Sequence, residues 1–226
     1  VATPGATTGL IGLLAVDPAF RRHHIGMRVG LAHITRLLDL GFIGQFTEAV
    51  TVHEGSQKLA LRSGAHECGM QLAAQSGSLD FRGFDVSAER RKSVLLFYGA
   101  IDATPERTSH VPPGYVELVT RIYDEGNLPR TVQSDMHRDL LEDLPEHSVF
   151  RLGLRSEANL GVVIVESYGR DFVSALQTRM AEIQLNRFEL IWVYLPLNDP
   201  LTAYFGSGLQ EIGLSFAGLY PEYGDG

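Results

Sequence analysis

A single cysteine, Cys68, occurs among the 226 residues of this sequence, which excludes an intramolecular disulfide and a cysteine cluster for a metal. No run approaches the ~20 consecutive apolar residues that a membrane-spanning helix needs. No signal peptide is visible, so we expect a cytoplasmic protein. Positive charge is scarce, with 19 Lys and Arg against 27 Asp and Glu. The net charge of −8 gives no basic field for nucleic acid, and an anionic ligand would need a local basic cluster.

Near the start of the sequence, a predicted strand and a turn run directly into a predicted helix. Gly9–Val16 is almost wholly apolar, which predicts a strand covered on both faces. Asp17-Pro18 ends that strand, because proline has no N–H for a ladder. From Ile25 the apolar residues take helical spacing, so a loop with Arg21 and Arg22 opens into a helix. Unpaired amides and the dipole at a helix start favour a phosphate or pyrophosphate at this loop.

These residues resemble the acyl-CoA-binding motif of the GNAT superfamily of acyl-CoA N-acyltransferases, (Gln/Arg)-x-x-Gly-x-(Gly/Ala). Arg21 matches its first position and Gly26 its last, whereas His24 stands at the usual glycine and would narrow the phosphate cradle. The resemblance implies that acetyl-CoA or CoA binds here, with the strand on the pantetheine arm and the loop on the pyrophosphate. The implied contacts are Leu14, Ala15, Val16, Arg21, Arg22, His23, His24, Ile25, Gly26 and Met27. The motif alone is equally compatible with a turn that carries two solvated arginines.

A second stretch resembles the other GNAT signature, Asn-x-x-Ala-x-x-Leu-Tyr-x-Lys-x-Gly-Phe. It comprises a strand, a short helix and another strand, predicted over 45–52, 56–63 and 65–72. Aligned on Gly64, which we expect to close the helix, His53 falls at the Asn position and Arg62 at the Lys position. Ala60 falls where many members carry the tyrosine that protonates the leaving thiolate. Residues 48–58 also resemble a bacterial subgroup in which a GNAT-like region accompanies an anti-sigma-factor-type ATPase module, although this sequence contains no ATPase motif.

The second half of the sequence repeats the predicted order of elements of the first. Residues 103–113 form a Pro/Thr/Ser-containing linker, so we predict two domains, 1–104 and 105–226. The repeat of strand, helix, strand, short helix and strand ends with a predicted strand over 214–219, and it indicates a second, degenerate GNAT-like unit. Its counterpart of the anion loop, residues 166–171, has acids at both ends, so phosphate binding is not expected there.

Two helical segments are also predicted in this half. Asp171 is expected to cap a helix whose apolar face begins at Phe172. A less regular helical segment is expected over 137–144.

A complete GNAT domain has three strands and usually two helices before its CoA-binding strand, which begins here near Gly9. The sequence also lacks an initiating Met. The resemblance therefore implies that the front part of the first domain is missing or is supplied from elsewhere. An exposed strand edge would remain and would favour pairing with another chain. We therefore expect a homodimer or a fragment of a larger protein.

The expected fold is mixed α/β, with a GNAT-like twisted mixed sheet flanked by helices and two such units in tandem. The resemblance implies acyl transfer from acyl-CoA to an unidentified small-molecule or protein amine. His53 and Glu48 are the candidates for acid or base catalysis, and His53 titrates in the useful range; a solvent-facing loop histidine is the alternative. The alternative function is a catalytically degenerate module that senses acyl-CoA or binds a protein, which His24 and Ala60 favour. No metal site is expected.

Overall fold

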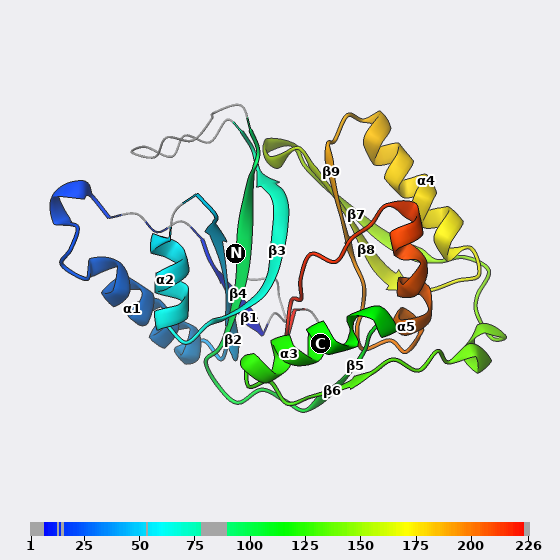
Figure 1. Cartoon of the computed structure of the whole chain (residues 1–226), viewed down its shortest axis with the longest axis horizontal. Coiled ribbons are helices and arrows are strands. Elements are labelled where there is room, and N and C mark those ends of the chain that lie inside the picture. Colours follow the sequence, from blue (N-terminus) through cyan, green and yellow to red (C-terminus); the bar gives the residue numbers. More distant parts are fainter. Residues whose placement is uncertain (1–6, 13, 15, 53, 78–89, 224–226) are drawn as a thin grey trace.

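The computed structural model describes residues 7–12, 14, 16–52, 54–77 and 90–223, and it shows a mixed α/β protein (Figure 1). The elements are, in order, β1 (Thr8–Ile11), α1 (Ile25–Asp39), β2 (Gly44–Val50), α2 (Gly55–Arg62), β3 (His66–Gln75), β4 (Lys92–Ala100), β5 (Arg107–His110), α3 (Val116–Glu125), β6 (Arg130–Gln133), β7 (Val149–Arg155), β8 (Leu160–Ser167), α4 (Phe172–Leu185), β9 (Leu190–Tyr194) and α5 (Leu201–Phe205). No helix in these described ranges is long and apolar enough to cross a membrane.

The first sheet has the strand order β1-β2-β4-β3. β1 and β2 are parallel and are joined through α1, whereas β4 runs antiparallel to both β2 and β3. Side chains alternate between its two faces. Ala49 and Phe97 pack with Ala60 of α2 on one face. Phe46 and Leu96 face the other way, into a core that includes residues of α3. The sheet is therefore buried on both sides along its central strands.

The first predicted strand is shorter and less covered than expected. The sequence predicts a strand over 9–16 with both faces buried, but β1 spans only Thr8–Ile11, and Leu13 and Ala15 lie outside the described residues. Leu10 is 55% exposed. The prediction of full burial was wrong for Leu10, because β1 lies at the edge of the sheet and pairs only with β2 among the described residues. An apolar sequence alone does not distinguish an edge strand from a central one.

The second sheet has the order β7-β8-β9 and lies on the right in Figure 1. β8 and β9 are parallel and are joined through α4, so the β1-α1-β2 arrangement recurs as β8-α4-β9. Its core includes Val163, Phe172 and Leu176. The predicted helical segment over 137–144 is only a 3-10 turn, Arg138–Leu141. Leu140 there is exposed, so its burial does not support a longer helix.

The final predicted strand, over 214–219, was wrong. The C-terminal segment, residues 213–223, instead crosses from α5 to the first sheet, where Gly69 and Gly218 form an isolated antiparallel bridge (Figure 1). The Leu219 amide donates to the Cys68 carbonyl at 2.8 Å, and the Met70 amide donates to the Ala217 carbonyl at 2.8 Å. Two glycines allow this approach, because a Cβ on either would meet backbone of the other strand. The segment thus covers part of the β3 edge.

Glu222 fixes the end of the C-terminal segment by a buried ion pair. Its side chain is fully buried and pairs with Arg130, whose side chain is 3% exposed. The Arg107 Nε also donates to the Glu222 Oε2 at 3.2 Å. The Thr7 hydroxyl donates to the Glu222 carbonyl at 3.0 Å, which ties β5, β6 and the start of the described chain to one residue.

Arg91 makes a second connection, between β3 and the second sheet. Its Nε donates to the Ala73 carbonyl at 2.7 Å, and its Nη2 donates to the Ala158 carbonyl at 2.6 Å. A further contact of 3.3 Å joins Nη1 to the exposed Glu189 carboxylate. Arg91 therefore joins the edge of the first sheet to the segments that precede β8 and β9.

Acidification is expected to weaken the fold through His110. His110 and His137 lie edge to face with ring centroids 5.9 Å apart, and neither His110 Nδ1 nor His137 Nε2 has a hydrogen-bond partner among the described residues. Burial and the His137 charge lower the pKa of His110, against the opposing carboxylates of Asp199 and Asp135. The unfolded chain then binds more protons, so this stability is complete above about pH 6.5 and falls as the pH drops below it. Urea unfolding of the wild type and His110→Gln at pH 7.5 and 5.5 tests this: a smaller acid loss in the variant is expected, and an equal loss contradicts it.

Candidate functional site

The loop between β1 and α1 has an unusual backbone. A 3-10 turn, Pro18–Phe20, follows the strand. Arg22 and His24 then adopt positive φ angles of 68° and 55°, which place both residues in the left-handed region. His24 is the residue before the first turn of α1. Two residues with a left-handed backbone, Arg22 and His24, therefore lead into α1, and no side chain caps the helix.

The first turn of α1 leaves its backbone amides open. The first helical hydrogen bond runs from the Arg28 amide to the His24 carbonyl at 3.0 Å. No side chain caps the helix, and its first turn holds no acidic residue. The amides of Ile25, Gly26 and Met27 have no acceptor within the described ranges. These donors and the helix dipole favour an anion at this position.

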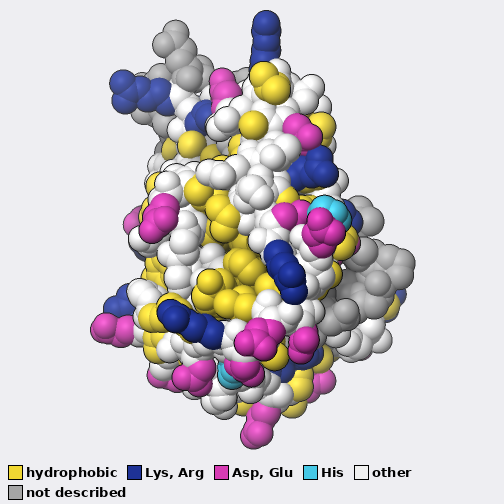
Figure 2. Space-filling model, turned by 90° about the vertical axis from the view of Figure 1, so that its right-hand side faces the viewer, with side chains coloured by type: hydrophobic (Ala, Val, Ile, Leu, Met, Phe, Trp, Pro, Cys, Tyr) yellow, Lys and Arg dark blue, Asp and Glu magenta, His cyan; other side chains and the backbone are white. Residues whose placement is uncertain are grey.

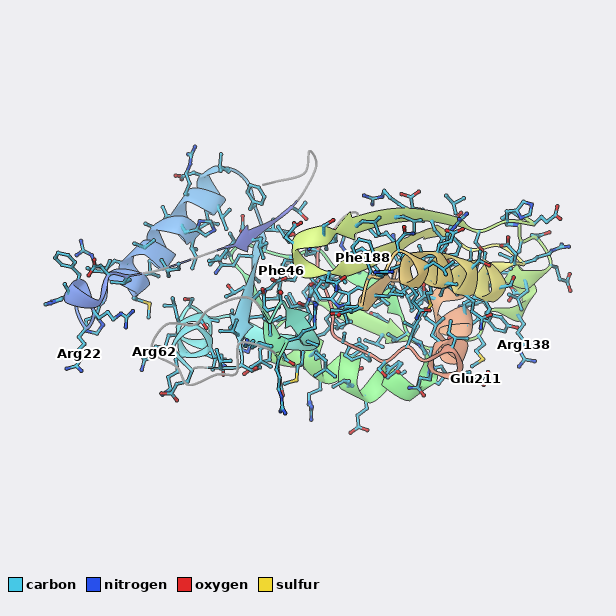
Figure 3. The ribbon with its side chains drawn as sticks, turned by 90° about the horizontal axis from the view of Figure 1, so that it is seen from above. Arg22, Phe46, Arg62, Arg138, Phe188 and Glu211 are labelled. Carbon is cyan, nitrogen blue, oxygen red and sulfur yellow. The ribbon has the colours of Figure 1, made fainter. Side chains whose placement is uncertain are left out.

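A cleft of about 400 Å³ opens beside this helix start, between the loop and α2. Four basic side chains belong to its lining, Arg21 and Arg22 from the loop and Lys58 and Arg62 from α2. Figure 3 shows Arg22 and Arg62 at the same end of the molecule, from these two elements. The remaining lining residues are Val16, Phe20, His24, Ile25, Gly26, Met27, Gly55 and Leu59. A negatively charged protein thus gathers a local basic cluster around unpaired amides.

Lys58 was missed by the sequence interpretation, and Arg62 was matched to a signature position without a site role. Their spacing of four residues puts both on one face of α2. Lys58 forms a 2.6 Å ion pair with Glu54 at the cleft rim, and the hydrogen bond and charge of Lys58 lower the pKa of the Glu54 carboxyl. The helical spacing within Ser56–Ser63 was the signal that could have identified both cations.

Seven of the predicted cofactor contacts line this cleft, namely Val16, Arg21, Arg22, His24, Ile25, Gly26 and Met27. The Leu14 side chain lies next to it, 3.9 Å from the position that a Cβ on Gly26 would take. His23 is exposed and does not line the cleft. Ala15 and the candidate catalytic residue His53 lie outside the described residues. Whether any of these residues binds a ligand stays a prediction.

Glu48, the second catalytic candidate, does not line the cleft. It follows Thr47, the last residue of β2 that pairs with β1 in the described ranges, and it lies opposite Leu96 of β4. Period-two alternation puts it on the Phe46 face, away from α2. Burial raises the pKa of the Glu48 carboxyl, and the Arg155 charge opposes this rise. Such a carboxylate is a stronger proton acceptor near neutral pH than an exposed one.

The corresponding loop of the second sheet is filled by the chain itself. The Gly169 amide donates to the Ser148 hydroxyl at 2.8 Å, and the Arg170 amide donates to the Pro145 carbonyl at 2.9 Å. Asp171 stands at the N-cap position of α4 as predicted, but its side chain makes no capping hydrogen bond to the helix. Its carboxylate instead accepts from the Ser148 amide at 2.7 Å and contacts His147 Nδ1 at 2.9 Å. A segment of the protein occupies here the space that is open beside α1.

Two further observations bear on the chemistry of the site. Ala60 of α2 is 4% exposed and its methyl group packs against the sheet. It therefore has no hydroxyl to present to the cleft. Within the described ranges, no three His, Cys, Asp or Glu side chains are grouped to hold a metal ion.

We expect His24→Gly to tighten anion binding. A non-glycine residue in the left-handed region costs roughly 1 kcal/mol of conformational free energy, and glycine avoids this cost. The larger backbone entropy that glycine loses on folding offsets part of the gain. The change also removes a side chain from the cleft lining. Calorimetric titration with inorganic pyrophosphate should show several-fold tighter binding than the wild type. His23→Gly, at an exposed neighbour outside the cleft, is the control, and weaker binding by His24→Gly would mean that the imidazole itself holds the anion.

No protein-family model and no curated protein matches this chain. Among solved structures, the ribosomal-protein-S18-alanine N-acetyltransferase from Escherichia coli is similar at 16% identity and a TM-score of 0.36, over 44% of this chain and 58% of that one. A Bacillus subtilis acetyltransferase in complex with CoA matches at 16% identity and a TM-score of 0.35, over 41% and 60%. A GNAT family acetyltransferase from Elizabethkingia anophelis with acetyl-CoA bound matches at 12% identity and 0.34, over 42% and 61%. The matches span about three fifths of the length of each of these chains.

Proposed function

We propose that this chain is a GNAT-type N-acyltransferase that binds acetyl-CoA, with its pyrophosphate in the cleft at the start of α1. The observation that carries this proposal is the convergence of three open amides and four basic side chains on one cleft. Phosphate groups are recognised in this way by helix starts and by Arg and Lys side chains. The bound thioester supplies an acyl group on a good leaving group. The sequence resemblance to the two GNAT signatures supports the same assignment.

In this proposal the residues of the chain bind the cofactor and move one proton. Arg21, Arg22, Lys58 and Arg62 neutralise the phosphates. Glu48 accepts a proton from an acceptor ammonium, R–NH3⁺, and so makes it a nucleophilic amine. The nitrogen then bonds to the acyl carbon as the C–S bond breaks, the proton that nitrogen loses goes to the sulfur, and Glu48 returns its proton to solvent. His53 remains an alternative acid or base.

The second candidate is an acyl-CoA-binding module without turnover. The observation that favours it is the buried methyl group of Ala60, because no hydroxyl stands there to protonate the leaving thiolate.

We propose for either function that the protein acts in the cytoplasm. We also propose that the unpaired edge of β1, with its exposed Leu10, pairs with a second copy or with part of a larger protein. Mass measurement in solution tests the pairing, and a monomer contradicts the homodimer.

Calorimetry with acetyl-CoA, CoA and acetyl-pantetheine tests the binding proposal. Acetyl-pantetheine lacks the pyrophosphate, so we expect micromolar binding of the first two ligands and at least tenfold weaker binding of the third. Equal binding of all three would remove the cleft from the proposal. A thiol-release assay over a panel of amines then separates the two candidates, because sustained turnover excludes a module that only binds.

A further inference from the structure

β7 is the outer strand of the second sheet, and one of its two edges has no partner strand among the described residues. On its other edge it pairs with β8 in an antiparallel ladder from Val149 to Arg155. Outside this ladder, the described part of the chain makes no hydrogen bond to the backbone of these seven residues. The free edge of β7 therefore presents amide and carbonyl groups with which another strand can pair.

β7 also lacks several features that protect the edge strands of natural sheets, such as proline, lysine and a bulge in the middle of the strand. Its sequence, VFRLGLR, contains no proline or lysine, and its one register shift lies at its start, between Val149 and Phe150. Two of its leucines are exposed, Leu152 by 44% and Leu154 by 56%. An apolar strand edge of this kind favours pairing with another chain.

The two faces of β7 differ in chemistry. One face carries Phe150, Leu152 and Leu154, and the other carries Arg151, Gly153 and Arg155. Phe150 stacks on Phe172 of α4 with ring centroids 5.9 Å apart, whereas the two exposed leucines extend the apolar face beyond this contact. On the other face, Arg151 pairs with Glu166 of β8 at 2.9 Å. A partner strand must therefore match apolar residues on one face and avoid like charges on the other.

A second copy of β7 meets both conditions in one antiparallel register. Leu152 is the middle residue of the strand, so a two-fold axis there pairs all seven residues. Leu152 then lies opposite Leu152 of the second copy, and Phe150 lies opposite Leu154 of that copy. On the charged face, Arg151 lies opposite Gly153, where a Cβ would have a single neighbour within 4 Å among the described residues. Moving the axis to Arg151 or Gly153 would place arginines directly opposite each other, which is unfavourable.

The surroundings of the second sheet favour a protein partner. Figure 2 views the molecule from the side on which this sheet lies in Figure 1, and it shows hydrophobic side chains among both acidic and basic ones. Nucleic acid and anionic membranes attract surfaces with an excess of basic residues, and this side shows no such excess. A self-complementary strand edge in this setting favours a second copy of the chain as the partner.

We propose that two copies of this chain pair through the free edges of β7, antiparallel about Leu152, and so join their three-stranded second sheets into one continuous sheet. Both copies use the same surface, so the assembly closes as a dimer with two-fold symmetry. The β1 edge belongs to the first sheet and is not part of this interface. The pairing does not depend on acyl transfer, because the cleft proposed for the cofactor lies at α1 and α2.

Disulfide cross-linking in the full chain tests the register. In Leu152→Cys the two introduced thiols lie on directly opposite residues, whose Cα atoms would be about 4.5–5.5 Å apart and within disulfide range. Leu154→Cys is the matched control, because each residue 154 lies opposite residue 150, roughly 13 Å along the strand from the other residue 154. The native Cys68 is buried and should not react. We expect mild oxidation to cross-link Leu152→Cys at least about tenfold faster than Leu154→Cys. Equal rates, or no cross-linked dimer, overturn the proposal.

Sedimentation equilibrium measures the strength of the dimer. We expect a dissociation constant on the order of 10 µM, because two paired edge strands form a small interface. Leu152→Lys places two ammonium groups opposite each other and should weaken dimerisation at least about tenfold. Leu185→Lys, at an 83% exposed residue of α4, adds the same charge away from the edge and should leave the dimer unchanged.

Two results of the sedimentation experiment would contradict the β7 interface. The first is a wild type that stays monomeric at about 100 µM. The second is a dimer that is retained in Leu152→Lys and lost in Leu10→Lys, because the copies would then pair through β1.

Discussion

Replacing Glu222 with glutamine is expected to lower the free energy of unfolding by about 3–5 kcal/mol, because it leaves a buried guanidinium without a counter-charge. The Arg130 side chain is 3% exposed and cannot turn to water without moving β6. Arg107 would then face Arg130 with no carboxylate between them. Urea unfolding at pH 7 measures the loss.

Glu211→Gln is the matched control, since Glu211 is exposed and makes no ion pair within the described ranges. Its free energy of unfolding should stay within about 0.5 kcal/mol of the wild type. A loss below 1 kcal/mol for Glu222→Gln would show that the ion pair is not a major source of stability. The double variant Arg130→Met, Glu222→Leu should recover part of the loss, because replacing both charges removes the unpaired one.

Arg21→Glu is expected to weaken acetyl-CoA binding about 100-fold. The wild-type guanidinium lines the cleft and is held by a 3.3 Å hydrogen bond from its Nε to the Val16 carbonyl. One charge-assisted hydrogen bond contributes about 1.5–3 kcal/mol, and the introduced carboxylate adds repulsion of the phosphates. Calorimetry at two salt concentrations measures the effect, which should shrink as the salt screens the charges.

The control for this charge reversal is Arg36→Glu. Arg36 is exposed in the last turn of α1, roughly 16 Å from the helix start at 1.5 Å per residue. It changes the net charge by the same amount outside the cleft. Equal losses in the two variants would attribute the effect to net charge, and binding would not depend on the loop.

Local patterns in the sequence predicted most of the helices and strands. The spacing of apolar residues from Ile25 identified α1, and Gly64 closes α2 in a left-handed conformation with φ of 81°. The loop with Arg21 and Gly26 was placed at the start of α1, where the structure has it. These features depend on residues a few positions apart, so they can be inferred without knowing the fold.

Features that depend on distant residues could not be predicted. The segment over 214–219 has the composition of a strand, but its backbone pairs with β3 at a single bridge because Gly69 and Gly218 meet there. Asp171 has the sequence context of a helix cap, yet its carboxylate is taken by Ser148 and His147. The packing of Tyr220 against Phe46, with ring centroids 5.1 Å apart, likewise joins residues more than 170 positions apart. In each case, tertiary packing overrides a local preference.

The bridge between Gly69 and Gly218 also has a consequence for the order of events in biosynthesis. β3 leaves the ribosome about 150 residues before the backbone that covers part of its edge. Arg107 emerges 115 residues before Glu222, and Arg130 emerges about 90 residues before it. Until then the nascent chain exposes an unpaired strand edge and two guanidinium groups without their carboxylate partner. Contacts of such long sequence separation form slowly and leave partly folded chains open to association. The interval before residue 222 is made is therefore the stage at which we expect the folding chain to be most open to association.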